Sequence, residues 1–129
     1  MGNYSKQRQK IIDIIEQMNK VPTAEEIYYK VIQFDATISK STVYRNLSFL
    51  EKNRNLIKIP ILDGPDRYFY KKDDSDYGFV ICQKCGKIQE FLIDFDWSIF
   101  QDNISKQTGA RVLKEDMLIK GICEECILK

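Results

Sequence analysis

Two pairs of cysteines constrain this chain more than any other feature of its sequence. The motifs Cys82-x-x-Cys85 and Cys123-x-x-Cys126 contain all four cysteines of a 129-residue chain. A C-x-x-C turn lets two thiolates bind one ion, and Zn²⁺ takes four such ligands in a tetrahedron. Residues 86–122 separate the pairs, which is more than the roughly 15–20 residues of a one-piece zinc ribbon. The spacing therefore predicts one structural zinc ion that ties a C-terminal element back onto an earlier turn.

Other uses of four thiols stay open at this point: disulfides, a redox dithiol, an iron–sulfur cluster, or four unrelated side chains. The polar start MGNYSKQRQK predicts no signal peptide, and hence a reducing, cytoplasmic compartment. No apolar run is long enough to span a membrane.

The chain contains no histidine, the side chain most used for metal sensing, proton transfer and nucleophilic triads. It also shows no glycine-rich phosphate loop and no evident nucleophile–base pair. We therefore expect neither an enzyme nor a small-molecule substrate.

Charge divides the chain into two halves. Residues 1–72 carry 13 Lys and Arg against 8 Asp and Glu, a balance of +5, whereas residues 73–129 carry 7 against 11, a balance of −4. The polar run of residues 71–76 lies at the crossover and is typical of a linker. This pattern predicts two domains, 1–72 and 73–129. The basic first half favours a polyanionic partner, although an ordinary solvated surface explains +5 equally well.

Helical periodicity organises the first half. Apolar residues between positions 6 and 18 recur at helical spacing. A second helix is expected to begin after Thr23, which forms a capping box with Glu26, and to end near Phe34. A third helix is expected to begin at Ser39 and to run to about Leu50.

The third predicted helix has two contrasting faces. Its core face carries Val43, Leu47 and Leu50. The opposite face offers hydroxyls, a phenol and a guanidinium, the groups that contact phosphates and base edges. The residues of this face are Ser41, Thr42, Tyr44, Arg45 and Ser48.

Two β-rich segments follow, residues 56–62 and 67–70, on either side of the turn Asp63-Gly64-Pro65-Asp66. They predict a hairpin. Three helices and a hairpin make a winged helix, whose third helix enters the major groove of double-stranded DNA. The alternative is a small helical bundle in which these polar residues are merely exposed.

The second half predicts strands at residues 79–81 and 88–93, a helix from Trp97 to about Lys106, and a strand over 111–120. A domain of so few residues buries only a small hydrophobic core by itself. Zinc and a C2 homodimer are expected to supply the missing stability. The predicted fold class is α+β: an N-terminal winged-helix DNA-binding domain, followed by a small α/β dimerisation domain with a four-cysteine zinc site.

Four segments together resemble the ferric uptake regulator family, which includes peroxide- and zinc-responsive repressors. They are residues 22–28 (PTAEEIY), 41–47 (STVYRNL), 81–88 (ICQKCGKI) and 121–126 (GICEEC). The resemblance implies a dimeric winged-helix transcriptional regulator that binds an inverted-repeat operator. It also implies structural zinc ligands at Cys82, Cys85, Cys123 and Cys126.

Within this resemblance, Tyr44 and Arg45 match positions on the DNA-reading helix of the family. We expect Arg45 to contact phosphate or a base edge and Tyr44 to contact a sugar or a thymine methyl group. Further basic residues are expected to contact phosphates: Lys6, Arg8, Lys40 and Arg67.

The chain departs from the family at the second, histidine-rich site through which relatives sense metal. The residues at the matching positions are Val21, Phe69, Tyr77, Phe79 and Glu90. Only Glu90 retains a ligand group, and one carboxylate does not hold an ion. We expect a degenerate sensing site whose apolar residues form a hydrophobic contact between the two halves.

The resulting hypothesis is a DNA-binding regulator, a repressor, with one structural Zn²⁺ and no working metal sensor. Two alternatives remain. One is a zinc-stabilised protein-interaction module that does not bind DNA. The other is a thiol redox switch in which oxidation releases the zinc.

Overall fold

The structure, a computed structural model, describes residues 2–18, 21–113 and 117–128. The chain divides into two compact units, residues 1–73 and 74–129. No described helix is long and apolar enough to cross a membrane.

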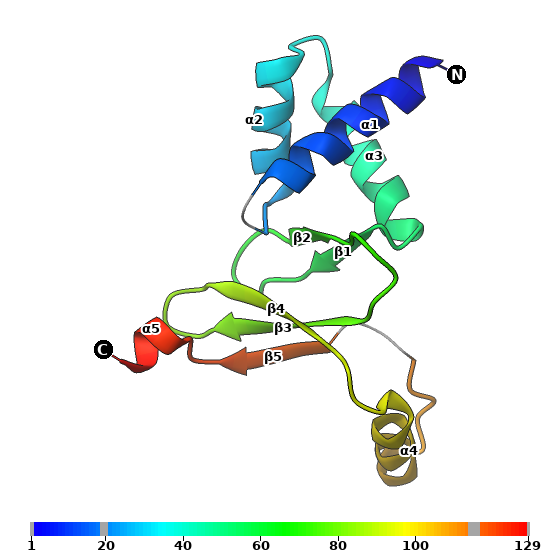
Figure 1. Ribbon diagram of the computed structural model, residues 1–129, viewed down its shortest axis with the longest axis vertical. Helices are drawn as coiled ribbons and strands as arrows, with labels where there is room; N and C mark the ends of the chain where they lie inside the picture. The colour runs from blue at the N-terminus through cyan, green and yellow to red at the C-terminus, as the bar shows by residue number, and fades with distance from the viewer. Residues whose placement is uncertain (1, 19–20, 114–116, 129) are drawn as a thin grey trace. The chain divides into compact units, whose positions relative to one another are not determined.

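The described residues of the first unit form three helices and a two-stranded sheet (Figure 1). The helices are α1 (Gly2–Gln17), α2 (Ala24–Phe34) and α3 (Lys40–Lys52), and the strands are β1 (Leu56–Ile59) and β2 (Arg67–Tyr70). Their apolar faces meet in one core made of Ile11, Ile14, Ile15, Ile27, Val31, Ile38, Val43, Leu47, Leu50, Leu56 and Tyr68.

Local hydrogen bonds begin both inner helices. Thr23 Oγ1 accepts from the backbone N–H of Glu26 (3.1 Å), and the Glu26 carboxylate accepts from the N–H of Thr23 (2.9 Å). This reciprocal pair satisfies two N–H groups that the first turn of α2 leaves unpaired. Ser39 Oγ accepts from the N–H of Thr42 (3.1 Å) and starts α3 in the same way. Both predicted helix starts are therefore confirmed.

Strands β1 and β2 pair antiparallel, with Leu56 opposite Tyr70 and Ile59 opposite Arg67. Residues before α2 extend this pairing, because the Tyr68 N–H donates to the Pro22 carbonyl (2.8 Å). The winged-helix prediction is thus confirmed. β1 ends at Ile59 rather than continuing to Leu62, since Pro60 has no N–H to donate to a ladder.

The second unit is built on a three-stranded sheet of order β4-β3-β5. β3 (Tyr77–Cys82) pairs antiparallel with β4 (Ile88–Leu92) and parallel with β5 (Met117–Gly121). Across the antiparallel ladder Gly78 faces Phe91. A Cβ at Gly78 would clash with the Phe91 ring, so the ring covers the glycine.

The described residues of this unit also form two helices, α4 (Trp97–Thr108) and the single turn α5 (Glu124–Ile127). The carboxylate of Asp96 caps the start of α4, and Gly109, at φ 75°, ends it in the left-handed conformation that glycine adopts easily. No residue of α4 is buried, and Figure 1 shows this helix standing apart from the three strands.

The predicted elements differ from the observed ones mainly at their ends. α1 begins at Gly2, before the expected position 6. A strand is predicted over 111–120, but residues 111–113 have no regular structure and 114–116 lie outside the described residues. β5 occupies only Met117–Gly121.

Replacing Thr23 by Ala should lower the free energy of unfolding by about 1 kcal/mol, because two reciprocal cap hydrogen bonds are lost. Urea unfolding followed by circular dichroism measures the change. Gln33→Ala, at an exposed position of the same helix, is the matched control and should stay within about 0.5 kcal/mol of the parent. Equal effects of the two substitutions would show that the capping box contributes nothing.

Candidate functional site

Strand register brings the two cysteine pairs to one end of the sheet. In the parallel ladder Cys82, the last residue of β3, lies opposite Gly121, the last residue of β5. The N–H of Gln83 donates to the Gly121 carbonyl (2.8 Å) and extends the pairing by one step. Because both strands end together, the turn after β3 and the turn after β5 meet.

The first pair lies in a tight turn between β3 and β4. The Gly86 N–H donates to the Cys82 carbonyl, and the Cys82 N–H donates to the Lys87 carbonyl, both at 2.9 Å. Gly86 has φ 80°, a conformation that a side chain would strain. The turn therefore directs both thiols to the same side, with Cys85 more exposed than Cys82.

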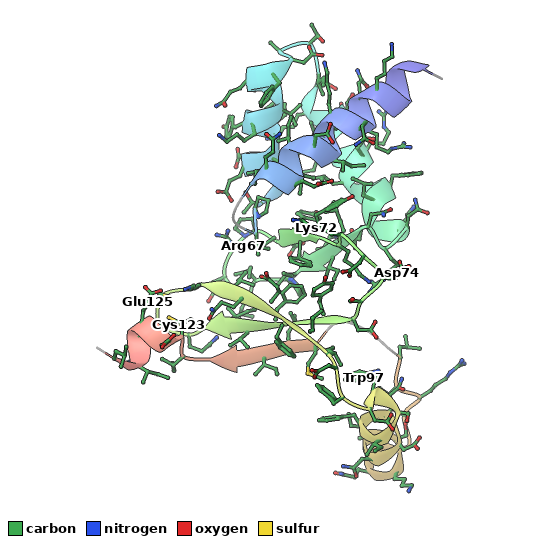
Figure 2. The ribbon with its side chains drawn as sticks, in the orientation of Figure 1. Arg67, Lys72, Asp74, Trp97, Cys123 and Glu125 are labelled. Atoms are coloured by element: carbon green, nitrogen blue, oxygen red, sulfur yellow. The ribbon has the colours of Figure 1, made fainter. Side chains whose placement is uncertain are left out.

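The second pair straddles the start of α5. Cys123 is the N-cap residue of this helix and Cys126 lies within it. Figure 2 shows Cys123 where the chain leaves β5 and Glu125 on the short helix that follows. Cys82, Cys123 and Cys126 are all buried and form a cluster of their own.

The four sulfurs have the separation that one metal ion requires. All four Sγ atoms lie within 4.8 Å of one another, and those of Cys85 and Cys123 are 3.7 Å apart. A tetrahedron with Zn–S bonds of about 2.3 Å has edges of about 3.8 Å. All four cysteines are free thiols. The predicted cofactor, one Zn²⁺, fits this closed set of four donors.

Backbone N–H groups prepare the site for negative charge. Cys82 Sγ accepts from the N–H groups of Cys123 (3.3 Å), Cys85 (3.4 Å) and Lys84 (3.4 Å). These hydrogen bonds, that of Cys123 first, lower the pKa of the Cys82 thiol to about 5. The hydrogen bond to Cys123, together with burial, raises the pKa of Cys126 to about 12. One thiolate is thus favoured in the metal-free site, and binding an ion would displace the remaining protons.

An ion pair joins the two turns beside the cysteines. Lys87 Nζ lies 3.0 Å from Glu125 Oε1, and the pKa of Lys87 is raised because Glu125 accepts its hydrogen bond. The C-x-x-C spacing does not indicate this pair, since the contact depends on both turns being folded.

A second candidate site is the outer face of α3. Ser41, Tyr44, Arg45 and Ser48 are exposed, while Thr42 is half-buried. Lys40 lies at the start of the helix with its ammonium 5.9 Å from the Tyr44 ring centroid. These side chains share one surface, as the helical spacing predicts.

The other basic residues predicted to contact phosphate are placed differently. Lys6 is exposed on α1. Arg67, labelled in Figure 2, donates to the Val21 carbonyl (3.0 Å) and lies 3.7 Å from Glu26. Arg8 donates from Nε to the Asn46 side chain (3.0 Å). Arg8 and Arg67 therefore donate hydrogen bonds inside the first unit.

Asn46 is a site residue that the sequence pattern did not reveal. It is 3% exposed, although it lies next to Arg45 on a polar stretch of α3. Its Nδ2 donates to the Thr42 carbonyl (2.8 Å), while its Oδ1 accepts from Arg8. A buried side chain with both ends of its amide paired is typical of an organising role.

The residues of the expected degenerate sensing site offer little to a metal. Phe79 is fully buried, Val21, Phe69 and Tyr77 are half-buried, and Glu90 is exposed. In the part of the chain that the structure describes, the four cysteines are the only group of three or more Cys, His, Asp or Glu side chains that could hold an ion.

Comparison with known proteins identifies a family and several relatives of similar sequence. The sequence model described as "Ferric uptake regulator family" matches residues 2–120. The ferric uptake regulation protein of Helicobacter pylori is 32% identical over 123 residues, covering 95% of this chain and 80% of that protein. The peroxide operon regulator of Bacillus subtilis is 28% identical over 126 residues, covering 95% and 83% respectively.

Solved structures are similar as well. The H. pylori regulator superposes with a TM-score of 0.70 over 95% of this chain and 80% of that chain, and its structure is described as having three functional metal-binding sites. The peroxide stress regulator of Campylobacter jejuni gives a TM-score of 0.74 at 24% identity, covering 96% of this chain and 91% of its own. The latter likeness concerns the fold alone.

Cys123→Ser should release the metal, because three thiolates and a hydroxyl bind Zn²⁺ far less well than four thiolates. The zinc content of the reduced protein, measured by elemental analysis, should fall from about one ion per chain to well below one. Thermal unfolding should shift to lower temperature. Glu124→Gln, an exposed neighbour that is not a ligand, should keep both. A parent protein with four reactive thiols and no zinc would contradict the assignment.

Proposed function

The chain belongs to the ferric uptake regulator family, and from that premise we propose that it is a sequence-specific DNA-binding transcriptional regulator. It acts as a homodimeric repressor with one structural Zn²⁺ per chain and binds an inverted-repeat operator in double-stranded DNA. No reaction chemistry is assigned to it. The observation that carries the proposal is the exposed polar face of α3 on a winged-helix unit.

DNA reading is assigned to the α3 face. Its hydroxyls, phenol and guanidinium project from a helix whose opposite side is fixed in the core. A helix held in this way can enter a major groove without unfolding. Arg45 and Tyr44 are proposed to contact base edges and sugar, and Lys40 and Lys6 are proposed to contact phosphates.

Dimerisation is assigned to the second unit. Many of the large apolar side chains among its described residues are exposed, and we assign them to a surface that a second copy of the chain covers. They are Leu92, Phe95, Ile99, Phe100, Ile104, Leu113, Leu118, Ile119, Ile122, Ile127 and Leu128. Within the described residues β5 is an edge strand, so a second copy would also satisfy its unpaired backbone groups.

The zinc ion is assigned a structural role. Four protein ligands close its coordination sphere and leave no open position for a signal or a substrate. Among the described residues of the second unit, three of the four buried apolar side chains are cysteines, so their coordination stabilises this unit directly.

Metal sensing is proposed to be absent. The H. pylori relative is described as having three functional metal-binding sites, whereas this chain has no histidine and one candidate metal cluster among its described residues. A metal shifts a conformational equilibrium only by binding one state more tightly than the other. Without ligands for a second ion, a metal cannot shift this equilibrium. The occupancy of the operator would then be set by the abundance of the protein.

A thiol redox switch is the second candidate function. It is favoured by Cys85, which is exposed while the other three cysteines are buried. Oxidation of this thiolate would remove a zinc ligand. If peroxide releases the zinc but the affinity for DNA stays constant, the redox switch is excluded and the zinc has only its structural role.

Arg45→Ala should weaken binding to the operator by about 1–3 kcal/mol, because a guanidinium contact to the DNA is lost. Fluorescence anisotropy with operator and random duplexes measures the change. The control Lys106→Ala removes the same charge from the exposed face of α4 and should have little effect. Unchanged affinity of Arg45→Ala for both duplexes would exclude α3 as the reading helix.

Operator affinity of the zinc-loaded protein should be the same at every point of an Fe²⁺ or Mn²⁺ buffered series. The reason is that no described cluster besides the four cysteines can bind a second ion. A tenfold or larger gain in affinity at micromolar metal would contradict the proposed loss of sensing. An iron- or manganese-responsive member of the family, titrated alongside, is the positive control for this metal series.

A further inference from the structure

A single arginine of α1 joins that helix to the proposed DNA-reading helix. The Arg8 guanidinium carbon lies 3.6 Å from the centroid of the Phe49 ring, in a cation–π stack. Its Nε donates to Asn46 Oδ1 at 3.0 Å. The two contacts come from successive turns of α3, and together they fix both the position and the plane of the guanidinium.

The hydrogen bonds continue to the start of α3. Asn46 Nδ2 donates to the Thr42 carbonyl (2.8 Å), and Thr42 Oγ1 lies 2.9 Å from Ser39 Oγ, the N-cap side chain. Asn46 is 3% exposed, so a broken link would leave a buried polar group unpaired. The chain Arg8–Asn46–Thr42–Ser39 therefore spans α3 from its second turn to its cap.

The residues that Arg8 holds lie beside Arg45. Phe49 follows Arg45 by four residues, so their side chains are neighbours along one stripe of the helix. Asn46 lies next to Arg45 on the buried side. A rotation of α3 about its axis, or a sliding of α3 along α1, would therefore disturb the stack, the hydrogen bond and the position of Arg45 together.

Arginine is the side chain that suits this position. Its planar fork stacks on a ring and donates from Nε at the same time, which the point charge of lysine does not do. The apolar residues of α1 and α3 already meet in the core of the first unit. The Arg8 bridge adds a directional contact to this packing, because a stack and a hydrogen bond depend on angle as well as on distance.

We propose that Arg8 is a positioning residue, which sets the orientation of α3 for operator recognition through Phe49 and Asn46 instead of contacting DNA phosphate. This inference rests on the proposed function and changes the role that the sequence predicts for Arg8. A phosphate contact needs only positive charge. A positioning contact needs the guanidinium plane and its Nε donor.

Three variants separate the two roles: Arg8→Lys keeps the charge, Arg8→Gln removes it, and Phe49→Leu removes the ring. Lys30→Gln is the matched control, since it removes a charge from an exposed position of α2. Operator and random-duplex affinities are measured over a range of salt concentrations. Circular dichroism verifies that each variant keeps its helices.

For a positioning role, Arg8→Lys and Arg8→Gln both lose roughly tenfold in operator affinity. Random-duplex affinity and its salt slope stay at the parent value. The Arg8→Lys, Phe49→Leu double variant is no weaker than Arg8→Lys alone, because both changes break one contact. The Lys30→Gln control retains operator affinity.

Two outcomes overturn the proposal. One is full operator affinity of Arg8→Lys together with a salt slope for Arg8→Gln that is smaller by about 0.9, the signature of one lost phosphate contact. The other is additive effects of Arg8→Lys and Phe49→Leu. If the parent protein binds no duplex, the proposed function fails by itself. The same double-mutant cycle in urea midpoints then decides whether Arg8 couples α1 to α3.

Discussion

Coordination of one ion by two cysteine pairs is the constraint on which the second unit depends. The pairs follow the last residues of β3 and β5, two strands that lie in parallel register but are joined by a long connection. Closing that connection costs chain entropy, and metal–thiolate bonds offset it. Among the described residues of this unit, the buried apolar side chains are Phe79 and three of the four cysteines. The cluster therefore takes the place of a hydrophobic core.

Because few apolar side chains of the second unit are buried, many of its apolar residues stay exposed. α4 buries no residue of its own, and several apolar residues of β5 and α5 are exposed. The zinc site fixes the end of β5, which carries Leu118 and Ile119 of this surface, so metal binding would support dimerisation in the proposed regulator. The first unit needs no such support, since eleven buried side chains among its described residues form one core.

Local sequence signals predicted much of this structure. Thr23 and Glu26 identify the start of α2, and Ser39 identifies the start of α3. The C-x-x-C spacings identify the metal donors. Each of these signals depends on residues that are close together in the sequence. The start of β5 and the ends of the hairpin strands depend on pairing partners elsewhere. Arg8 shows the same limit for the site: its charge indicates a DNA contact, but its stacking on Phe49 requires the helices to be packed.

Hydrogen–deuterium exchange of the reduced protein, with zinc bound and after chelation, tests the central role of the metal most directly. Amides of β3 and β5, and that of Gln83 between them, should be protected with zinc and exchange rapidly without it. Amides of α2 around Ile27 and Val31 serve as an internal reference. Retained protection of β3 and β5 in the metal-free protein would show that the strands hold their register without the ion, and would contradict this account.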